Sequence, residues 1–144
     1  MKNNDLIYIA CDHAGFELKE QIFNLIKDKY TTEDLGTKSK DSVDYPDFAQ
    51  KLAKNVLEKE CKGILICGSG VGMSIAANRF AGIRAVLAHN KDYAKLSRQH
   101  NDSNVLVLGA RLISFEQAQK ILNIWLNTDF EGGRHQLRIA KIDL

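Results

Sequence analysis

The residues best suited to chemistry form the run Cys67-Gly68-Ser69-Gly70-Val71-Gly72, a cysteine followed by alternating glycines. The apolar segment before it is typical of a strand, and a helix is predicted over 74–79. Such a turn exposes backbone N–H groups at a helix N-terminus, where the helix dipole favours negative charge. A thiol at that positive end is favoured as its thiolate and is available as a base. The run indicates chemistry on an oxyanion, although a Gly-rich turn beside a buried cysteine has the same pattern.

Two further sets of polar residues follow predicted strands. Asp12 and His13 come directly after the apolar segment 6–11, and Arg111 follows the segment 105–108. His13 is suited to binding phosphate or moving a proton, and a solvated loop pair is the alternative. Arg111 is either a ligand for an anion or an exposed charge that extends over the sheet edge.

Other candidates lie on or next to predicted helices. His100 and Asn101 follow a helix predicted to end at Gln99, where a surface or capping role is equally compatible with the pattern. Arg134 and Arg138 are four residues apart, so a helix places both guanidinium groups on one face. Two planar guanidinium groups suit a phosphate, and a basic helix that meets solvent or a partner is the alternative.

Strands and helices are predicted to alternate five times along the chain. Apolar runs predict the strands and a helical spacing of apolar residues predicts the helices between them. Because the strands are apolar throughout, we expect a parallel sheet covered by helices on both faces, with ligands beyond the carboxyl ends of its strands. The 144 residues contain no repeat or linker, which predicts a single domain over 1–144. The predicted strands are 6–11, 31–35, 64–67, 83–88 and 105–108. The predicted helices follow the apolar residues of 18–26, run from Tyr45-Pro46 to about residue 57, cover 74–79 and 91–99, and follow the apolar residues of 118–126, with a further helical segment after Gly133.

Composition narrows the function classes. The chain is 44% hydrophobic and 26% charged with a net charge of +2, which argues against a nucleic-acid or membrane partner. No segment approaches the roughly 20 apolar residues of a membrane span. The three cysteines are odd in number and lack metal-ligand spacing, and no secretory signal is recognisable. We therefore expect a cytoplasmic protein with reduced thiols and no bound metal.

The glycine run matches only part of a dinucleotide fingerprint. Its third glycine, Gly72, falls one position too early for G-x-G-x-x-G, and the run follows the third strand. Asn78 and Arg79 come soon afterwards in place of a ribose-binding acid. A nucleotide cofactor is therefore not expected.

Taken together, these residues resemble the B-type ribose-5-phosphate isomerases, which belong to a wider family with the galactose-6-phosphate isomerase subunits. The matching segments occur in family order along essentially the whole chain, and their co-occurrence makes the resemblance specific. They are Ala10-Cys11-Asp12-His13-Ala14-Gly15, Asp44-Tyr45-Pro46-Asp47, Cys67-Gly68-Ser69-Gly70-Val71-Gly72-Met73-Ser74, Ala77-Asn78-Arg79, Gly82-Ile83-Arg84-Ala85, Arg98-Gln99-His100-Asn101-Asp102, Leu108-Gly109-Ala110-Arg111 and Gly133-Arg134-His135.

The resemblance implies a Rossmann-like three-layer αβα sandwich with a five-stranded parallel sheet and a C-terminal helical extension. It also implies a homodimer or tetramer with active sites shared between subunits, acting on a phosphosugar without metal or nucleotide cofactor. The implied reaction interconverts ribose 5-phosphate and ribulose 5-phosphate. Cys67 matches the base of one branch of the family, while Met73 stands where a second branch has a glutamate.

The remaining roles are carried over position by position. Ser69 stands where some relatives have threonine, so a hydroxyl for proton relay is kept. His100 matches the histidine that opens the furanose ring, contributed by the neighbouring subunit. The implied substrate-binding residues are Asp12, His13, Tyr45, Gly68, Ser69, Gly70, Val71, Gly72, Asn101, Arg111, Arg134 and Arg138.

Two other functions remain open at this point. The first is isomerisation of a longer sugar phosphate, such as allose 6-phosphate or galactose 6-phosphate, by the same chemistry. The second is a catalytically silent phosphosugar-binding module, in which Cys67 and His100 are expendable. Both residues being present favours a pentose phosphate isomerase.

Overall fold

The computed structural model describes residues 4–144, whose five strands form one parallel sheet. The strand order is β2-β1-β3-β5-β4, and every neighbouring pair runs parallel. The strands are β1 (Leu6–Cys11), β2 (Thr31–Asp34), β3 (Lys62–Cys67), β4 (Ala85–Leu87) and β5 (Val105–Gly109).

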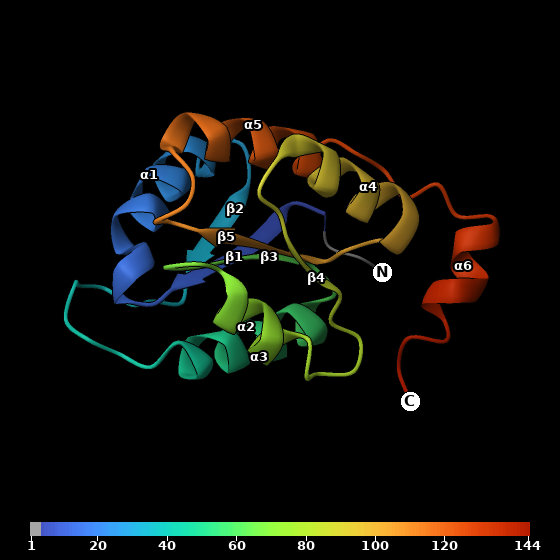
Figure 1. Ribbon diagram of the computed structural model, residues 1–144, viewed down its shortest axis with the longest axis horizontal. Coiled ribbons are helices and arrows are strands. Elements are labelled where there is room, and N and C mark those ends of the chain that lie inside the picture. The colour runs from blue at the N-terminus through green and yellow to red at the C-terminus, as the bar shows by residue number, and fades with distance from the viewer. Residues whose placement is uncertain (1–3) are drawn as a thin grey trace.

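Helices cover both faces of the sheet (Figure 1). One core cluster joins the sheet to α1, α4 and α5, and a second joins the opposite face to α2 and α3. The predicted three-layer αβα sandwich is therefore confirmed, as is a helix after the final glycines. The helices are η1 (His13–Gly15), α1 (Phe16–Ile26), α2 (Tyr45–Lys59), α3 (Val71–Ala77), α4 (Lys91–Asn101), α5 (Phe115–Leu126) and α6 (Arg134–Ile139).

The central strands have continuous apolar sequences because both of their faces are covered. Every residue of β1 and β5 is buried, and β3 is buried from Gly63 onward. The edge strands are less covered, and β2 alternates between exposed and half-buried residues. This pattern is typical of a parallel sheet between two helical layers.

Three predicted element boundaries are wrong for local reasons. Helix α3 begins at Val71, because the left-handed conformation of Gly70 makes the whole turn and leaves Gly72 inside the helix. Helix α4 continues to Asn101, so His100 lies in its last turn instead of after it. Strand β4 spans only Ala85–Leu87, since the Asn78 side chain hydrogen-bonds both backbone groups of Ala85 where the strand begins.

Because the sheet is parallel, all strands have their carboxyl ends on one side of the molecule and their amino ends on the other. The carboxyl ends of the strands point towards the end of Figure 1 at which α1 lies, and the end of α4 together with α6 lies at the other end. Within residues 4–144, no helix is both long enough and apolar enough to cross a membrane.

Candidate active site

The candidate site lies where the connections from β1 and β3 diverge. Strands β1 and β3 are neighbours in the sheet; the connection after β1 leads to α1 on one face, and the connection after β3 leads to α3 on the other. The two strand ends remain joined, because the Asp12 N–H donates to the Ile66 carbonyl oxygen over 3.2 Å. A Cβ on Gly15 would lie 2.6 Å from that oxygen, so only glycine allows this close approach. Ligands of open α/β sheets bind at such a crevice.

The Cys67 thiol ends β3 and is held by the turn that follows it. The Gly70 N–H donates to Cys67 Sγ over 3.2 Å, and Cys67 is buried. Gly70 has a φ of +80°, and a Cβ there would lie 2.4 Å from Leu87 Cδ1. The turn therefore requires glycine at this position for both its backbone conformation and its packing. A donor aimed at sulfur stabilises the negative charge of a thiolate.

The glycine turn is shaped by two side chains from other elements. A Cβ on Gly68 would lie 3.0 Å from Arg111 Nη1, and one on Gly72 would lie 2.5 Å from the Tyr45 ring. Arg111 from the end of β5 and Tyr45 from the start of α2 therefore lie against opposite parts of the turn. The Arg111 N–H also donates to the Gly68 carbonyl oxygen over 2.9 Å. The structure thus brings these predicted residues together around Cys67.

Two N–H groups of the turn are used within the protein. The Gly70 N–H points at the thiol, and the Val71 N–H donates to Ser69 Oγ over 3.2 Å. Contacts from this turn to an anionic ligand therefore depend on its other N–H groups and on the exposed Ser69 hydroxyl.

Asp12 and His13 have different roles at the end of β1. The Asp12 carboxylate accepts hydrogen bonds from the N–H groups of Ala14 and Gly15 and so caps the short helix η1. His13 Nδ1 accepts an N–H from Val43 over 3.2 Å, which leaves Nε2 as the donor of the neutral ring. His13 thus keeps one N–H to donate, while the Asp12 carboxylate is engaged by its own turn.

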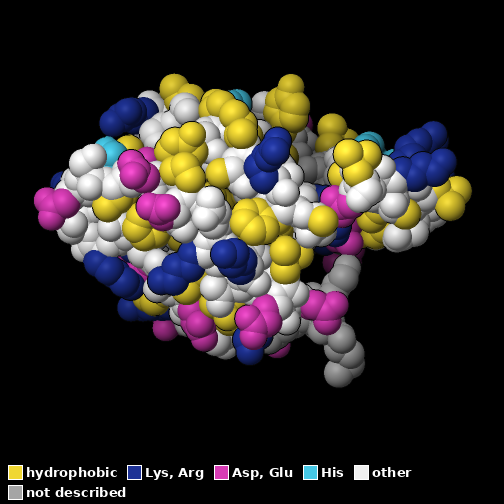
Figure 2. Space-filling view, turned by 90° about the horizontal axis from the view of Figure 1, so that it is seen from below, with side chains coloured by type: hydrophobic (Ala, Val, Ile, Leu, Met, Phe, Trp, Pro, Cys, Tyr) yellow, Lys and Arg dark blue, Asp and Glu magenta, His cyan; other side chains and the backbone are white. Residues whose placement is uncertain are grey.

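The other predicted site residues lie at the opposite end of the strands, beside their amino ends. His100 and Asn101 occupy the last turn of α4, where Arg84 Nε donates to the Asn101 carbonyl oxygen at the start of β4. Strand β3 alone separates the edges by roughly 16 Å, at about 3.3 Å per residue step. Arg134 and Arg138 lie on α6, which projects from the same end with basic side chains at its tip (Figure 2). One chain therefore does not bring these four residues to Cys67.

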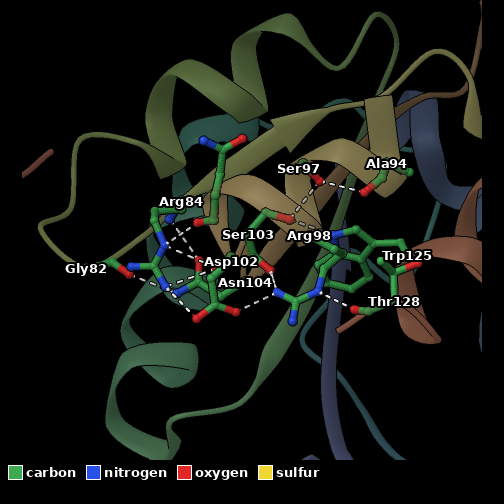
Figure 3. Close-up of polar contacts among 11 residues, drawn as sticks. Gly82, Arg84, Ala94, Ser97, Arg98, Asp102, Ser103, Asn104, Trp125 and Thr128 are labelled. Atoms are coloured by element: carbon green, nitrogen blue, oxygen red, sulfur yellow. Dashed lines mark hydrogen bonds and ion pairs between the residues drawn. The ribbon is translucent and has the colours of Figure 1, made fainter. Parts of the chain in front are cut away.

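A polar network that the sequence did not reveal holds the end of α4 (Figure 3). The buried Arg98 pairs with Asp102 at 2.9 Å and donates to the carbonyl oxygens of Ser103 and Thr128. Arg84 donates to the Asp102 carbonyl oxygen over 3.0 Å. The only sequence signal for this network is the four-residue spacing of Arg98 and Asp102, because its other members come from distant segments.

His100 also takes part in a cluster that sequence reasoning missed. Glu131 Oε1 lies 3.8 Å from His100 Nε2 and 3.4 Å from His135 Nε2. The imidazole rings stack with centroids 4.3 Å apart and planes inclined by 15°. Ligand atoms of the three side chains lie within 4.8 Å of one another, but a metal binds in the plane of an imidazole at about 2.0–2.1 Å. Nearly parallel rings must tilt before both can bind one ion, so this arrangement is a pair of stacked imidazoles with one carboxylate oxygen near both Nε2 atoms.

The other two cysteines are poor nucleophiles. Burial raises the pKa of the Cys11 thiol to about 12, and burial likewise raises the pKa of the Cys61 thiol to about 11. Both side chains belong to the core clusters. They are structural thiols, which leaves Cys67 as the cysteine placed for chemistry.

Known proteins match this chain over most of its length. The family model for ribose/galactose isomerases matches residues 7–142. The chain is 49% identical to ribose-5-phosphate isomerase B of Escherichia coli (strain K12) over 138 residues, which covers 94% of this chain and 93% of that protein.

Solved structures share both the fold and the sequence. A ribose 5-phosphate isomerase from Thermotoga maritima is 52% identical with a TM-score of 0.94, over 98% of this chain and 99% of that one. Ribose-5-phosphate isomerase B from Mycoplasma genitalium, solved with bound ribulose 5-phosphate, is 43% identical with a TM-score of 0.91. That match covers 95% of this chain and 93% of the other.

Proposed function

Because this chain belongs to the ribose/galactose isomerase family, we propose that it interconverts D-ribose 5-phosphate and D-ribulose 5-phosphate, with Cys67 as the base. The observation that carries the proposal is the Cys67 thiol at the carboxyl edge of the sheet, with the Gly70 N–H directed at its sulfur. The relative solved with bound ribulose 5-phosphate supports this choice of substrate.

The reaction moves a carbonyl from C1 to C2 of the sugar. The Cys67 thiolate takes the proton from C2, and the electron pair of that C–H bond forms a C1–C2 double bond with negative charge on O1. The Ser69 hydroxyl relays the O2 proton to O1, and the thiol returns its proton to C1 as the carbonyl forms at C2. A positioned base of this kind contributes about a hundred- to ten-thousandfold.

The enediolate intermediate needs donors that are in place before the charge develops. The exposed Ser69 hydroxyl and the N–H groups of the turn that have no internal acceptor are the candidates. One such donor is worth roughly 3 kcal/mol. The Gly70 N–H is directed instead at Cys67 Sγ, where it stabilises negative charge whenever the thiolate forms.

The phosphate requires cations that a single chain supplies only in part. The Arg111 guanidinium is the cation at the carboxyl ends of the strands, where His13 adds an N–H donor, and we assign Arg134 and Arg138 of a second copy to the same phosphate. A guanidinium fork binds two phosphate oxygens at once, which fixes the distance of the sugar from the thiolate. Tyr45, together with Asn101 of the second copy, is then free to contact the sugar itself.

We further infer a homodimer, in which each site takes His100 and α6 from the other chain. His100 opens the furanose ring of the bound sugar by proton transfer. Exposed apolar side chains support such an interface: Leu137 on α6 is 73% exposed and Ile75 on α3 is 61% exposed. A helix that buries none of its own residues, as α6 does, needs another surface to cover it.

The direct test is Cys67→Ala, with Cys61→Ala as the matched control. We expect Cys67→Ala to lower kcat by about a hundred- to ten-thousandfold while phosphosugar binding, measured by calorimetry, stays within a few-fold. Cys61→Ala should keep its activity, since that thiol lies in the core near the other edge. Undiminished turnover by Cys67→Ala would remove the thiol from the mechanism and favour a silent binding module.

Shared sites are tested by mixing two inactive variants, Cys67→Ala and His100→Asn. In a mixed dimer, one site receives both intact residues and the other receives neither. Random mixing therefore restores about a quarter of the wild-type activity. A mixture with no more activity than its components contradicts sharing. Assays with allose 6-phosphate and galactose 6-phosphate then decide whether a longer sugar is preferred.

A further inference from the structure

We propose that Glu131 and His135 are positioning residues, which hold the ring-opening His100 and the phosphate-binding arginines of α6 in a fixed relation. The proposal rests on the function proposed above, in which neither residue takes part in the chemistry. In this proposal, the end of α4 and the start of α6 move as one rigid unit, and this unit of each chain completes the active site of the other chain.

The geometry of the cluster suits this role. A single carboxylate oxygen of Glu131 lies between the Nε2 atoms of His100 and His135, at 3.8 and 3.4 Å. The rings stack face to face, so His135 limits the tilt of the His100 ring while Glu131 attracts its Nε2 edge. The His135 side chain is only 13% exposed, whereas His100 is 41% and Glu131 50% exposed. His135 is therefore the covered member against which His100 rests.

The backbone around Glu131 is fixed to α4. The Glu131 N–H donates to the Gln99 carbonyl oxygen over 3.0 Å, one residue before His100. Arg98 Nε donates to the Thr128 carbonyl oxygen over 3.1 Å, which ties the preceding residues to the same helix. The hydrogen bonds to α4 thus fix the position of Glu131, and the contact of Glu131 with His135 links α4 to α6.

Helix α6 depends on this attachment, because it buries none of its six residues. At its far end, Asp143 Oδ2 accepts the Gly82 N–H over 2.8 Å. His135 lies between Arg134 and Arg138 in the sequence, so a change in its packing turns both guanidinium groups. Elements with few buried contacts open most easily, and loss of one anchor here loosens the whole helix.

The experiment separates the contribution of the Glu131 carboxylate from that of the ring stack, with three variants and a control. Glu131→Gln removes the charge, His135→Phe keeps a ring for stacking, and His135→Leu removes both the ring and its nitrogen. Glu116→Gln is the matched control, because Glu116 forms an exposed ion pair with Lys120 at 3.5 Å on α5. Each variant is assayed with ribose 5-phosphate and with ribulose 5-phosphate, whose phosphorylated O5 prevents ring closure.

Misplacement of a catalytic group by about 1 Å can cost up to about a hundredfold. We expect Glu131→Gln to lower kcat on ribose 5-phosphate about tenfold or more, with a smaller loss on ribulose 5-phosphate. His135→Leu should also raise KM about tenfold, and His135→Phe should restore most of that loss. Melting temperatures close to that of Glu116→Gln exclude general unfolding.

A double variant makes the test specific to His100. If Glu131 acts through His100, Glu131→Gln causes no further loss of kcat in the His100→Asn background, because the side chain that Glu131 positions is already absent. An additive loss overturns the proposal, and so does full activity of both Glu131→Gln and His135→Leu. If His100→Asn itself keeps wild-type turnover, the ring-opening role fails, which is a distinct result.

Discussion

Replacing Gly70 by alanine tests how closely the glycine turn must approach its neighbours to hold the thiol. Gly70 has a φ of +80°, and a left-handed backbone costs an alanine about 1–2 kcal/mol. The new Cβ would lie 2.4 Å from Leu87 Cδ1 and 3.2 Å from the Leu108 carbonyl oxygen. Relieving that overlap costs about a further 1–3 kcal/mol. We therefore expect Gly70→Ala to lose about 2–5 kcal/mol of stability.

Gly132 provides a matched control. Its φ is +69°, but a Cβ there meets nothing within 4 Å in the described part of the chain. Gly132→Ala should therefore lose only the backbone cost of about 1–2 kcal/mol. Urea unfolding at equal chain concentration measures both variants, because association would shift the apparent stability.

The Gly70→Ala substitution is also expected to lower catalytic activity. Displacing the Gly70 N–H removes a hydrogen bond to Cys67 Sγ, and a bond to a charged group is worth about 1.5–3 kcal/mol. We expect kcat/KM of Gly70→Ala to fall by about ten- to a hundredfold. Equal stability losses in Gly70→Ala and Gly132→Ala, with full activity in the first, would refute the account of how this turn holds the thiol.

Two further predictions concern the buried ionisable groups. Lys19 is fully buried and pairs with Asp34 at 2.7 Å, so Lys19→Met should cost about 3–5 kcal/mol of unfolding free energy in urea. Burial raises the pKa of Asp34, but the Lys19 hydrogen bond and other favourable contacts outweigh burial, and the pKa is lowered overall. The ionised Asp34 therefore stabilises the wild-type protein above about pH 4, and this stability is lost as the pH falls below that value. That acid-dependent loss should shrink in Lys19→Met, and an unchanged pH dependence contradicts the pairing. Because burial raises the pKa of the Cys11 thiol to about 12 and that of the Cys61 thiol to about 11, both thiols stay protonated at pH 7. Iodoacetamide should therefore label Cys67 alone by mass spectrometry, and earlier labelling of either core thiol refutes this.

Local patterns predicted most of the fold. Continuous apolar runs indicated β1, β3 and β5 because those strands are covered on both faces, and the spacing of Leu18, Ile22 and Ile26 indicated α1. Boundaries failed where a side chain or a special backbone conformation ended an element, as Asn78 does at β4. The spacing on α1 gave no sign that Lys19 is buried, because its partner Asp34 lies on β2.

The sequence by itself determined the αβα fold, the glycine turn after Cys67 and the family, because each depends on residues close together in the chain or on motifs in a fixed order. Only the tertiary structure decided that His100 and α6 lie at the opposite sheet edge from Cys67, since helix α4 runs back against the strands and ends beside their amino ends. It alone joined Glu131 to His100 and His135, and it alone directed the Gly70 N–H at the sulfur. The contact between His100 and Glu131 joins segments that are far apart in the chain, and the Gly70 contact depends on the left-handed backbone of that glycine; a sequence pattern encodes neither.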